Sequence, residues 1–404
     1  MAGSRMLLVA FGALVLMPLI TGLDPNVALF TAGAGTLLFQ IVTRGQIPVF
    51  LASSFAFIAP MIAAQQRFGL AETMGALMAA GVLYVLLAAA VRAKGTGFID
   101  RVLPPVVIAP VIMVIGLSLA PVAANMAMGK SGDGAEQLIP YADALVISLL
   151  SLAVTVAVAV LARGLLRLVP IIAGVVAGYV LSFAYGVVDT ASVAEAAWLA
   201  VPSFTAPAFD WRAIVFMLPV AIAPAIEHIG DVLAISSVTR EDYLKRPGLH
   251  RTLLGDGLAT TLAAGMGGPP NTTYSEVTGA VMLTRNFNPR VMTWAAGFAI
   301  ALAFIGKFGA ALQTIPVPVM GGILCLLFGS IAVVGLNTLI RHQVDLSIAR
   351  NLAVVAVTLV FGIGGLVIGR GQYSLEGIAL CSIVAVGMNL VLPGSEHWGR
   401  RDAA

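Results

Sequence analysis

The chain has 404 residues, of which 59% are hydrophobic and only 10% are charged, and its formal net charge is +3. Soluble domains carry about 25% charged residues, so this composition excludes an ordinary soluble protein. The small net charge comes mostly from Lys and Arg between apolar runs and does not indicate nucleic-acid binding. Apolar runs close to the roughly 20 residues that cross a bilayer recur from end to end, which predicts an all-α polytopic membrane protein.

Fourteen hydrophobic segments are predicted. The first has no clear small-residue cleavage site and is expected to remain as a span rather than to be removed as a signal peptide. If the N-terminus is cytoplasmic, most Lys and Arg fall near the inner side, which favours an even number of spans with both termini inside. The segments cover residues 5–22, 26–43, 48–66, 71–93, 105–128, 142–162, 165–187, 213–238, 250–267, 269–285, 291–312, 319–340, 350–369 and 374–393.

The third and tenth segments, 48–66 and 269–285, differ from the others. Both are short, follow or contain proline, and carry a hydroxyl pair before an aromatic residue: Ser53-Ser54-Phe55 and Thr272-Thr273-Tyr274. Short, interrupted segments at corresponding places in two halves indicate a transporter binding site. Each is third in a run of seven, which predicts two repeats. Because seven crossings end on the opposite side, the repeats would be inverted.

The tenth segment is expected to be a broken helix. Pro269 and Pro270 end any helix that arrives from Thr260, because proline restricts φ and lacks a backbone donor. A polar run follows, and Glu276 then begins a second apolar helical run. Extended backbone in such apolar surroundings must line a cavity or be buried in protein.

A second acidic cluster, Glu227 and Asp231, lies within the eighth segment. Residues four apart share one face of a helix, whereas the adjacent His228 points elsewhere. Carboxylates in a membrane cost about 2.5–3.5 kcal/mol at the helix centre and are a functional-site hypothesis by default, although a structural polar tie is the alternative. A desolvated carboxylate can hold a proton near neutral pH. It can also accept hydrogen bonds from the N–H groups of a planar heterocycle.

Other polar residues have two interpretations. Glu276 either binds a ligand or is favoured by the helix dipole, and both can hold. Asp256 is either a buried polar tie or part of a proton path. The aromatic residues Phe55, Tyr274 and Phe328 pack ordinarily or offer a face to a planar ligand.

The cysteines, Cys325 and Cys381, are expected to be buried free thiols, and their spacing predicts neither a metal site nor a disulfide.

At these residues the chain resembles the nucleobase–ascorbate transporter family, specifically its bacterial uracil permeases. The most specific signal is the run Pro270-Asn271-Thr272-Thr273-Tyr274, followed by Glu276, with Glu227-His228-Ile229-Gly230 some forty residues earlier. The other matching motifs are Phe11-Gly12-Ala13, Ser53-Ser54-Phe55-Ala56-Phe57, Gly95-Thr96-Gly97, Pro247-Gly248-Leu249-His250-Arg251 and Pro318-Val319-Met320-Gly321-Gly322.

The resemblance implies a proton-coupled nucleobase symporter of the bacterial inner membrane, with no cofactor other than the coupling proton. Segments 1–4 (5–93) and 8–11 (213–312) would form a core domain. Segments 5–7 (105–187) and 12–14 (319–393) would form a gate domain. Short strands in segments 3 and 10 would cross near the substrate, with the core moving against the gate by an elevator or rocking motion. The protein would be surrounded by lipid and would dimerise through its gate domains.

Site residues follow from the resemblance by position. Glu227 and Glu276 would bind the pyrimidine edge, and the backbone at Phe55 and Ser275 would add hydrogen bonds. Asp231 stands where family members have a histidine or aspartate tied to proton coupling. Ala13, Tyr274 and Phe328 would line the pocket.

Two positions depart from the uracil permease pattern. Val277 replaces an Asn that usually follows the carboxylate or glutamine of segment 10, and Ser275 replaces a Gly, with serine seen in the purine branch. A xanthine or purine symporter is therefore the alternative substrate class. From other classes, a channel would need a continuous polar pore, and an intramembrane enzyme would need a nucleophile–base or metal arrangement. The sequence predicts neither.

Overall fold

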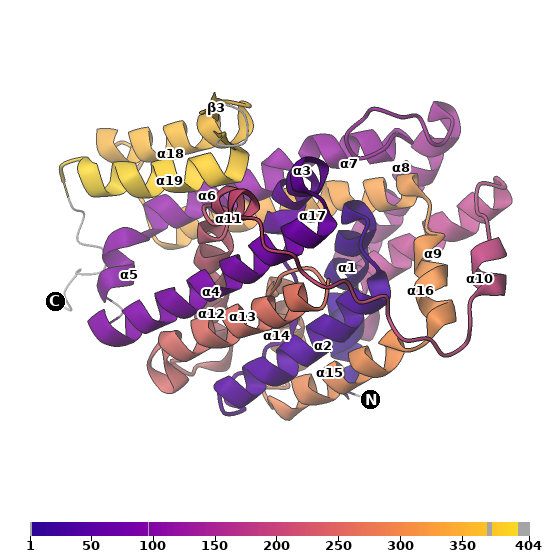
Figure 1. Cartoon of the computed structure of the whole chain (residues 1–404), viewed down its shortest axis with the longest axis horizontal. Coiled ribbons are helices and arrows are strands. Elements are labelled where there is room, and N and C mark those ends of the chain that lie inside the picture. Colours follow the sequence, from indigo (N-terminus) through magenta and orange to yellow (C-terminus); the bar gives the residue numbers. More distant parts are fainter. Residues whose placement is uncertain (1, 96, 370–373, 395–404) are drawn as a thin grey trace.

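Helices make up most of the computed structural model, which describes residues 2–95, 97–369 and 374–394 (Figure 1). The α-helices are α1 (Ala2–Thr21), α2 (Pro25–Val42), α3 (Ile58–Phe68), α4 (Leu70–Lys94), α5 (Gly97–Val102), α6 (Pro105–Ser118), α7 (Ala120–Ala127), α8 (Tyr141–Leu161), α9 (Pro170–Ala184), α10 (Ala191–Glu195), α11 (Trp211–Met217), α12 (Ile222–Thr239), α13 (Leu249–Gly265), α14 (Ser275–Thr284), α15 (Arg290–Ala303), α16 (Gly306–Gln313), α17 (Val317–Arg341), α18 (Ala349–Ile363) and α19 (Gly377–Val391). Short turns of other helix types are η1 (Phe55–Phe57), η2 (Gly164–Leu168) and η3 (Leu244–Gly248).

Several helices are suited to crossing a membrane. Within the described residues, six are long and apolar enough by length and composition, and α11 with α12 forms a seventh candidate that is bent by 44°. Four shorter apolar helices accompany them: α9, α15, α18 and α19. Each of the fourteen predicted segments coincides with a helix, with consecutive helices or with a strand followed by a helix. The fold is thus that of a mostly helical, polytopic membrane protein, and the count of fourteen crossings stays a prediction.

Local sequence explains where these helices begin and end. At α2, the Asp24 side chain accepts a hydrogen bond from the backbone N–H of Asn26, and Pro25 occupies the first helical position, where its missing N–H costs nothing. At the C-terminal end of α4, Gly95 adopts φ of +79°, which glycine tolerates without the strain that a side chain would bring. Each helix therefore stops where its own residues dictate.

Two strands of three residues lie at the centre of the fold. β1 (Leu51–Ser53) pairs antiparallel with β2 (Asn271–Thr273), so that Leu51 faces Thr273 and Ser53 faces Asn271. The pairing continues past the strands, because the Ser54 N–H donates to the Pro270 carbonyl at 2.9 Å. This confirms the prediction that segments 3 and 10 begin as extended backbone and continue as helices. The exposed backbone groups find partners within the protein, as a membrane interior requires.

A second, smaller ladder pairs β3 (Val367–Ile368) with β4 (Leu375–Glu376) near the start of α19. Both strands are at least partly exposed. This ladder therefore lies near the surface of the molecule rather than in its core.

Glycine allows α4 and α13 to lie close together. A Cβ atom placed on Gly81 of α4 would come within 2.7 Å of the Gly257 carbonyl of α13, a distance that real Cβ atoms do not reach. Small residues let membrane helices approach in this way without a hydrophobic driving force between them. The close contact fixes α13, which leads into β2.

One expectation about the cysteines is wrong. Cys381 is buried, but Cys325 is exposed on α17, and both thiols are free. An apolar run has the same composition on its lipid-facing and inward-facing sides, so hydropathy cannot distinguish the two.

Candidate functional site

The paired strands place two half-helices at the middle of the bundle. After β1 the chain turns through η1 into α3, and after β2 it enters α14 directly at Ser275. Because the strands are antiparallel, the two half-helices leave the crossing in opposite directions. Glu276 is the second residue of α14 and thus lies in its first turn, as the sequence predicted. The Ser275 side chain lies outside the part of the chain that the structure describes.

Helix α12 carries Glu227 and Asp231 against this crossing. α12 contacts both β2 and α14. The Thr273 hydroxyl of β2 donates a 2.8 Å hydrogen bond to Asp231 Oδ2, and this contact joins α12 to the strand. One turn earlier, Glu227 Oε2 is buried without a hydrogen-bond partner among the described residues. The two carboxylates on one helix face therefore have different surroundings. Asp231 accepts a hydrogen bond from Thr273, whereas Glu227 has a buried oxygen that can accept a hydrogen bond from a ligand.

Asp256 of α13 lies against His228 of α12. Both side chains are fully buried, and His228 Nδ1 is 3.4 Å from Asp256 Oδ2 without hydrogen-bond geometry. The Thr272 hydroxyl also reaches Asp256 Oδ2, at 3.5 Å. The interpretation of Asp256 as a polar tie thus has specific contacts to support it, whereas its part in a proton path stays a prediction. His228 packs edge-on against Phe39 of α2 and so faces away from α14.

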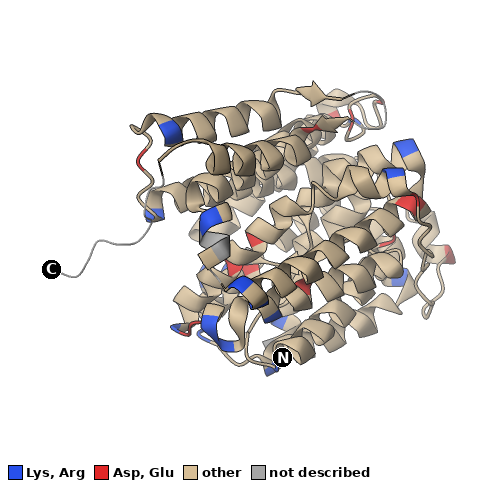
Figure 2. Cartoon of the chain, turned by 60° about the vertical axis from the view of Figure 1, so that its left-hand side comes forward, with Lys and Arg blue, Asp and Glu red and all other residues tan. Residues whose placement is uncertain are grey.

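Within the described part of the chain, no ion pair joins a Lys or Arg to the buried Asp256, whose basic neighbour is His228. Among the described residues, Asp231 and Asp256 are buried while every Lys and Arg is at least partly exposed. Figure 2 shows Asp and Glu positions within the bundle as well as around it. A carboxylate without a cationic partner is costly in a membrane interior, so the unpaired oxygen of Glu227 favours uptake of a proton or of a ligand donor.

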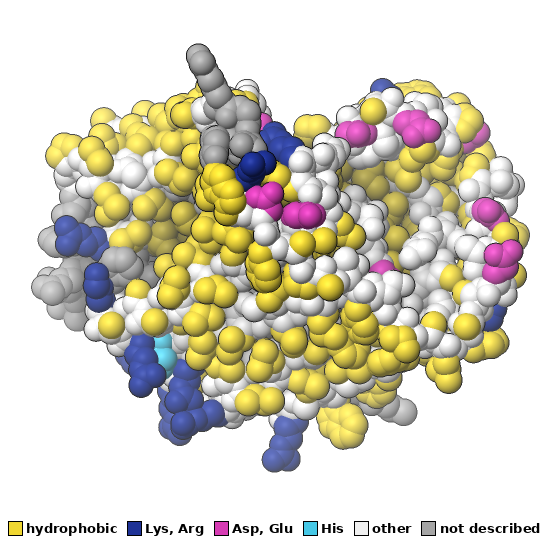
Figure 3. All heavy atoms as spheres, viewed as in Figure 1, with side chains coloured by type: hydrophobic (Ala, Val, Ile, Leu, Met, Phe, Trp, Pro, Cys, Tyr) yellow, Lys and Arg dark blue, Asp and Glu magenta, His cyan; other side chains and the backbone are white. Residues whose placement is uncertain are grey.

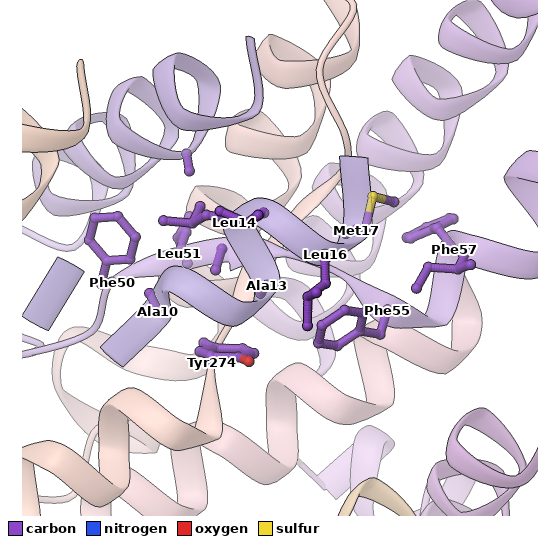
Figure 4. Packing of buried hydrophobic residues seen from close by; sticks show 14 of the residues in the cluster. Ala10, Ala13, Leu14, Leu16, Met17, Phe50, Leu51, Phe55, Phe57 and Tyr274 are labelled. Carbon is purple, nitrogen blue, oxygen red and sulfur yellow. The ribbon is translucent and has the colours of Figure 1, made fainter. Parts of the chain in front are cut away.

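Aromatic side chains form one wall of the site. The rings of Phe55 and Phe328 meet edge to face at 6.0 Å, and Phe55 lies 6.4 Å from the ring of Tyr274. Ala13 of α1 belongs to the same buried cluster. Figure 4 shows Ala13, Phe55 and Tyr274 in a single close view of it. The three residues predicted to line a pocket, Ala13, Tyr274 and Phe328, therefore belong to one buried cluster with Phe55.

Several buried polar atoms at the crossing have no hydrogen-bond partner among the residues that the structure describes. They include the hydroxyls of Ser53, Ser54 and Tyr274, together with Glu227 Oε2. In folded proteins the great majority of buried polar atoms are paired, and each exception calls for an explanation such as a ligand or water. This group of unpaired atoms is concentrated on the two broken segments and α12, where a small polar ligand would satisfy them.

Sequence reasoning missed some residues of this region. Thr273 was noted only as half of a hydroxyl pair, and the contact between His228 and Asp256 was not foreseen. Tyr84 of α4 was not considered, yet it is fully buried and its hydroxyl has no partner among the described residues. A tyrosine in the middle of an apolar run was the available signal. Within the described residues no group of three or more His, Cys, Asp or Glu could hold a metal ion.

Known proteins match this chain over nearly its whole length. A family model described as "Permease family" (Xan_ur_permease) matches residues 1–371. The probable uracil permease of Pasteurella multocida is 55% identical over 98% of this chain and 94% of its own length. The probable uracil permease of Haemophilus influenzae is 56% identical with the same coverage. The uracil permease of Escherichia coli K12 is 41% identical over 94% of this chain and 88% of its own.

Solved structures show the same fold at much lower identity. The transmembrane domain of the cyanobacterial bicarbonate transporter BicA has a TM-score of 0.68 at 15% identity and covers 96% of each chain. The murine anion transporter Slc26a9, solved in an inward-facing state, has a TM-score of 0.66 at 13% identity and covers 96% of this chain and 67% of its own. At this identity the likeness concerns the fold alone.

Proposed function

The chain belongs to this Permease family, and on that premise we propose that it carries uracil across the membrane together with protons. Membership confirms the resemblance to nucleobase transporters that the motifs indicated. It also makes the chain a multi-pass membrane transporter and not an enzyme. The relatives named above suggest uracil, and the geometry of the crossing supports that choice.

The observation that carries the proposal is the set of unpaired polar atoms beside two carboxylate-bearing elements. Uracil presents two N–H donors and two carbonyl acceptors in one plane. Glu227 has a buried oxygen free to accept, and Glu276 lies in the first turn of the facing helix. Charge-assisted hydrogen bonds of this kind are about twice as strong as neutral ones. The backbone at Phe55 and Ser275 would donate to the uracil carbonyls.

The apolar wall suits the faces of the same ring. The ring of Phe55 contacts the rings of Tyr274 and Phe328, and these aromatic faces would stack against a planar heterocycle, with the small Ala13 leaving room for it. Val277 is buried beside them and adds no polar group. A purine carries more polar edge atoms than uracil, and each one left unpaired costs about 1–3 kcal/mol. The pocket therefore favours a pyrimidine.

We assign proton coupling to Asp231 and Glu227 of α12. Asp256 of α13 is a further candidate for carrying the proton. Asp231 is buried and bound by Thr273, and Glu227 lies one turn away without a basic partner among the described residues. Binding a proton removes the cost of a buried charge, so loading of the site by substrate and by proton would favour each other.

The transport movement is proposed to follow the repeat architecture. Fourteen crossings in two inverted repeats would give a core of residues 5–93 and 213–312, which contains the strand crossing, and a gate of residues 105–187 and 319–393. The opposite directions of α3 and α14 support inversion, because each repeat contributes one strand and one half-helix. The core would move against the gate by an elevator or rocking motion.

Surface charge supports an orientation with both termini in the cytoplasm. Figure 3 shows hydrophobic side chains over the middle of one face, with Lys and Arg along its lower left and Asp and Glu along its upper right. Basic residues gather on the cytoplasmic side of membrane proteins. The basic side is therefore proposed to face the cytoplasm. The family resemblance is the support for the bacterial inner membrane and for a dimer through the gate domains.

Uptake by reconstituted protein tests this function. Proteoliposomes should accumulate labelled uracil when an inward proton gradient is imposed and should lose that accumulation when the gradient is collapsed. Unlabelled xanthine should compete at least tenfold more weakly than unlabelled uracil. Equal competition by xanthine would instead establish the purine alternative, and uptake without any response to the gradient would remove proton coupling.

A further inference from the structure

A second concave site lies at the basic end of the bundle, and none of its residues belongs to the substrate site. It is a pocket of about 270 Å³ between the loop after α2 and the start of α13. Ligand pockets usually measure about 300–1,000 Å³, so this one suits a small ligand or a headgroup. The lining residues are Arg44, Gln46, Arg246, Pro247, His250 and Arg251.

The lining is strongly cationic and contains no carboxylate. Within the part of the chain that the structure describes, Arg44, Arg246 and Arg251 form no ion pair. Three like charges around one concavity repel one another and create a positive potential within it. Figure 3 shows Lys and Arg gathered with a His side chain at the lower left edge of the molecule. An anion of matching size would relieve the repulsion.

Both walls of the pocket are held by hydrogen bonds close to it. The turn after α2 is closed by the Gly45 N–H, which donates to the Gln40 carbonyl at 2.7 Å. The Gln40 side chain then donates to the carbonyls of Ile47 and Val49. The opposite wall comes from η3 and the first turn of α13, where the Arg246 N–H donates to the Asp242 carbonyl at 2.9 Å and the Gly248 N–H donates to the Tyr243 carbonyl at 3.2 Å. The cationic side chains are therefore presented on supported backbone, which favours a specific site.

We propose that this pocket binds a phosphate group, carried either by a soluble phosphate ester or by the headgroup of an anionic lipid. The planar guanidinium groups of Arg44, Arg246 and Arg251 match phosphate oxygens with paired N–H donors. Gln46 Oε1 is buried and has no hydrogen-bond partner in the described part of the chain. The same amide can accept from a hydroxyl of the ligand or, turned over, donate to a phosphate oxygen.

The pocket joins two segments that lead to the strand crossing. The loop that carries Arg44 runs into β1, and α13 carries Asp256 less than two turns after Arg251. A phosphate that contacts both walls would hold these segments in one relative position. Its binding is expected to stabilise the folded protein whether or not the transported substrate is uracil.

Thermal unfolding of the purified full chain tests the site without reference to transport. The probes are inorganic phosphate and glycerol 3-phosphate in detergent, each compared with sodium chloride at equal ionic strength. A second arm compares nanodiscs of phosphatidylcholine alone with nanodiscs that also contain phosphatidylglycerol. At about a hundred times its dissociation constant, a bound ligand should raise the midpoint by roughly 2–4 °C.

Variants assign the effect to the pocket. Arg44→Gln/Arg251→Gln should abolish the rise, and Arg44→Lys/Arg251→Lys should keep part of it because charge remains while the paired donors are lost. Arg290→Gln/Arg341→Gln removes two charges predicted to lie on the same side but outside the pocket, and it should respond like the wild type.

The two arms separate the sources. A rise with the soluble phosphates supports a soluble ester, and a rise only with phosphatidylglycerol supports a lipid headgroup. No rise in either arm overturns the proposal. An equal rise in the Arg44→Gln/Arg251→Gln variant and the wild type does so as well, because the phosphate would then bind elsewhere. If the glutamine variant does not fold, the lysine variant supplies the same comparison.

Discussion

The hydroxyl of Thr273 donates a 2.8 Å hydrogen bond to the carboxylate of Asp231, across 42 residues of sequence. The bond connects the strand that crosses the centre of the protein to the helix that carries the acidic pair. Movement of a proton onto or off Asp231 would change the strength of this bond, because hydrogen bonds to charged groups are the stronger ones. The proposed substrate site and the proposed proton site therefore share a physical connection.

Thr273→Val tests that connection. Valine has nearly the same shape but no donor, and a hydrogen bond to a charged group is worth about 1.5–3 kcal/mol, or roughly 10- to 100-fold in an equilibrium. Gradient-driven uracil accumulation should fall at least tenfold, with a smaller effect on exchange of uracil for uracil. Thr272→Val is the matched control, because its hydroxyl reaches Asp256 only at 3.5 Å. Equal losses in the two variants would argue against a special role for the Thr273 bond.

Asp231→Asn removes the titrating group and keeps the side chain's size. Accumulation against a gradient should be abolished, since asparagine cannot carry the proton, while equilibrium exchange remains in part. Both activities are measured on the same proteoliposomes with labelled uracil. If exchange is lost as completely as accumulation, Asp231 does more than couple the proton.

Glu276→Gln should weaken uracil binding by more than tenfold. The change replaces an anionic acceptor with a neutral amide in a desolvated site, where charge-assisted hydrogen bonds matter most. Calorimetry on protein in detergent measures the affinity directly. Glu136→Gln, at an exposed position in the loop before α8, should leave it unchanged. Unaltered affinity in the Glu276 variant would place this carboxylate outside the binding site.

Val277→Asn addresses the choice between pyrimidine and purine. Val277 is buried at the start of α14, and an asparagine there would supply a donor and an acceptor beside the pocket. The wild type should prefer uracil over xanthine by roughly tenfold or more, which corresponds to about 1.4 kcal/mol. The variant should narrow this gap. The measurement is competition of labelled uracil uptake by unlabelled xanthine, and a gap that stays the same would show that position 277 does not contact the ligand.

The ion pair between Arg67 of α3 and Glu376 of β4 links the proposed core to the proposed gate. The two charges meet at 2.9 Å, and Arg67 also bonds the Ser374 hydroxyl and lies over the Phe216 ring. Both side chains are more than a third exposed, so the pair is worth no more than about 1 kcal/mol.

Breaking this pair should change the rate of uracil exchange by no more than about fivefold. Glu376→Gln is the cleaner single change, because Arg67→Gln also removes the contact with Phe216. The double variant Arg67→Gln/Glu376→Gln should exchange uracil at the same rate as Arg67→Gln alone. Exchange is measured on the wild type, the two single variants and the double variant. Strictly additive effects would mean that the pair does not act as a unit.

Local sequence determined the class of the protein and the positions of its breaks. Pro269 and Pro270 remove two adjacent backbone donors and so disfavour a continuing helix, and Glu276 lies in the first turn of a new one, so the interruption of segment 10 followed from residues that are neighbours in the chain. The pairing of acidic residues on one face of α12 followed in the same way from helix periodicity.

Contacts between distant segments were decided only by the tertiary structure. The register of β1 against β2, the bond from Thr273 to Asp231 and the approach of His228 to Asp256 each depend on how helices pack, which composition does not encode. The exposure of Cys325 against the burial of Cys381 has the same origin. In a membrane protein both the lipid-facing and the inward-facing sides of a helix are apolar, so hydropathy loses the contrast that marks the buried face of a soluble protein.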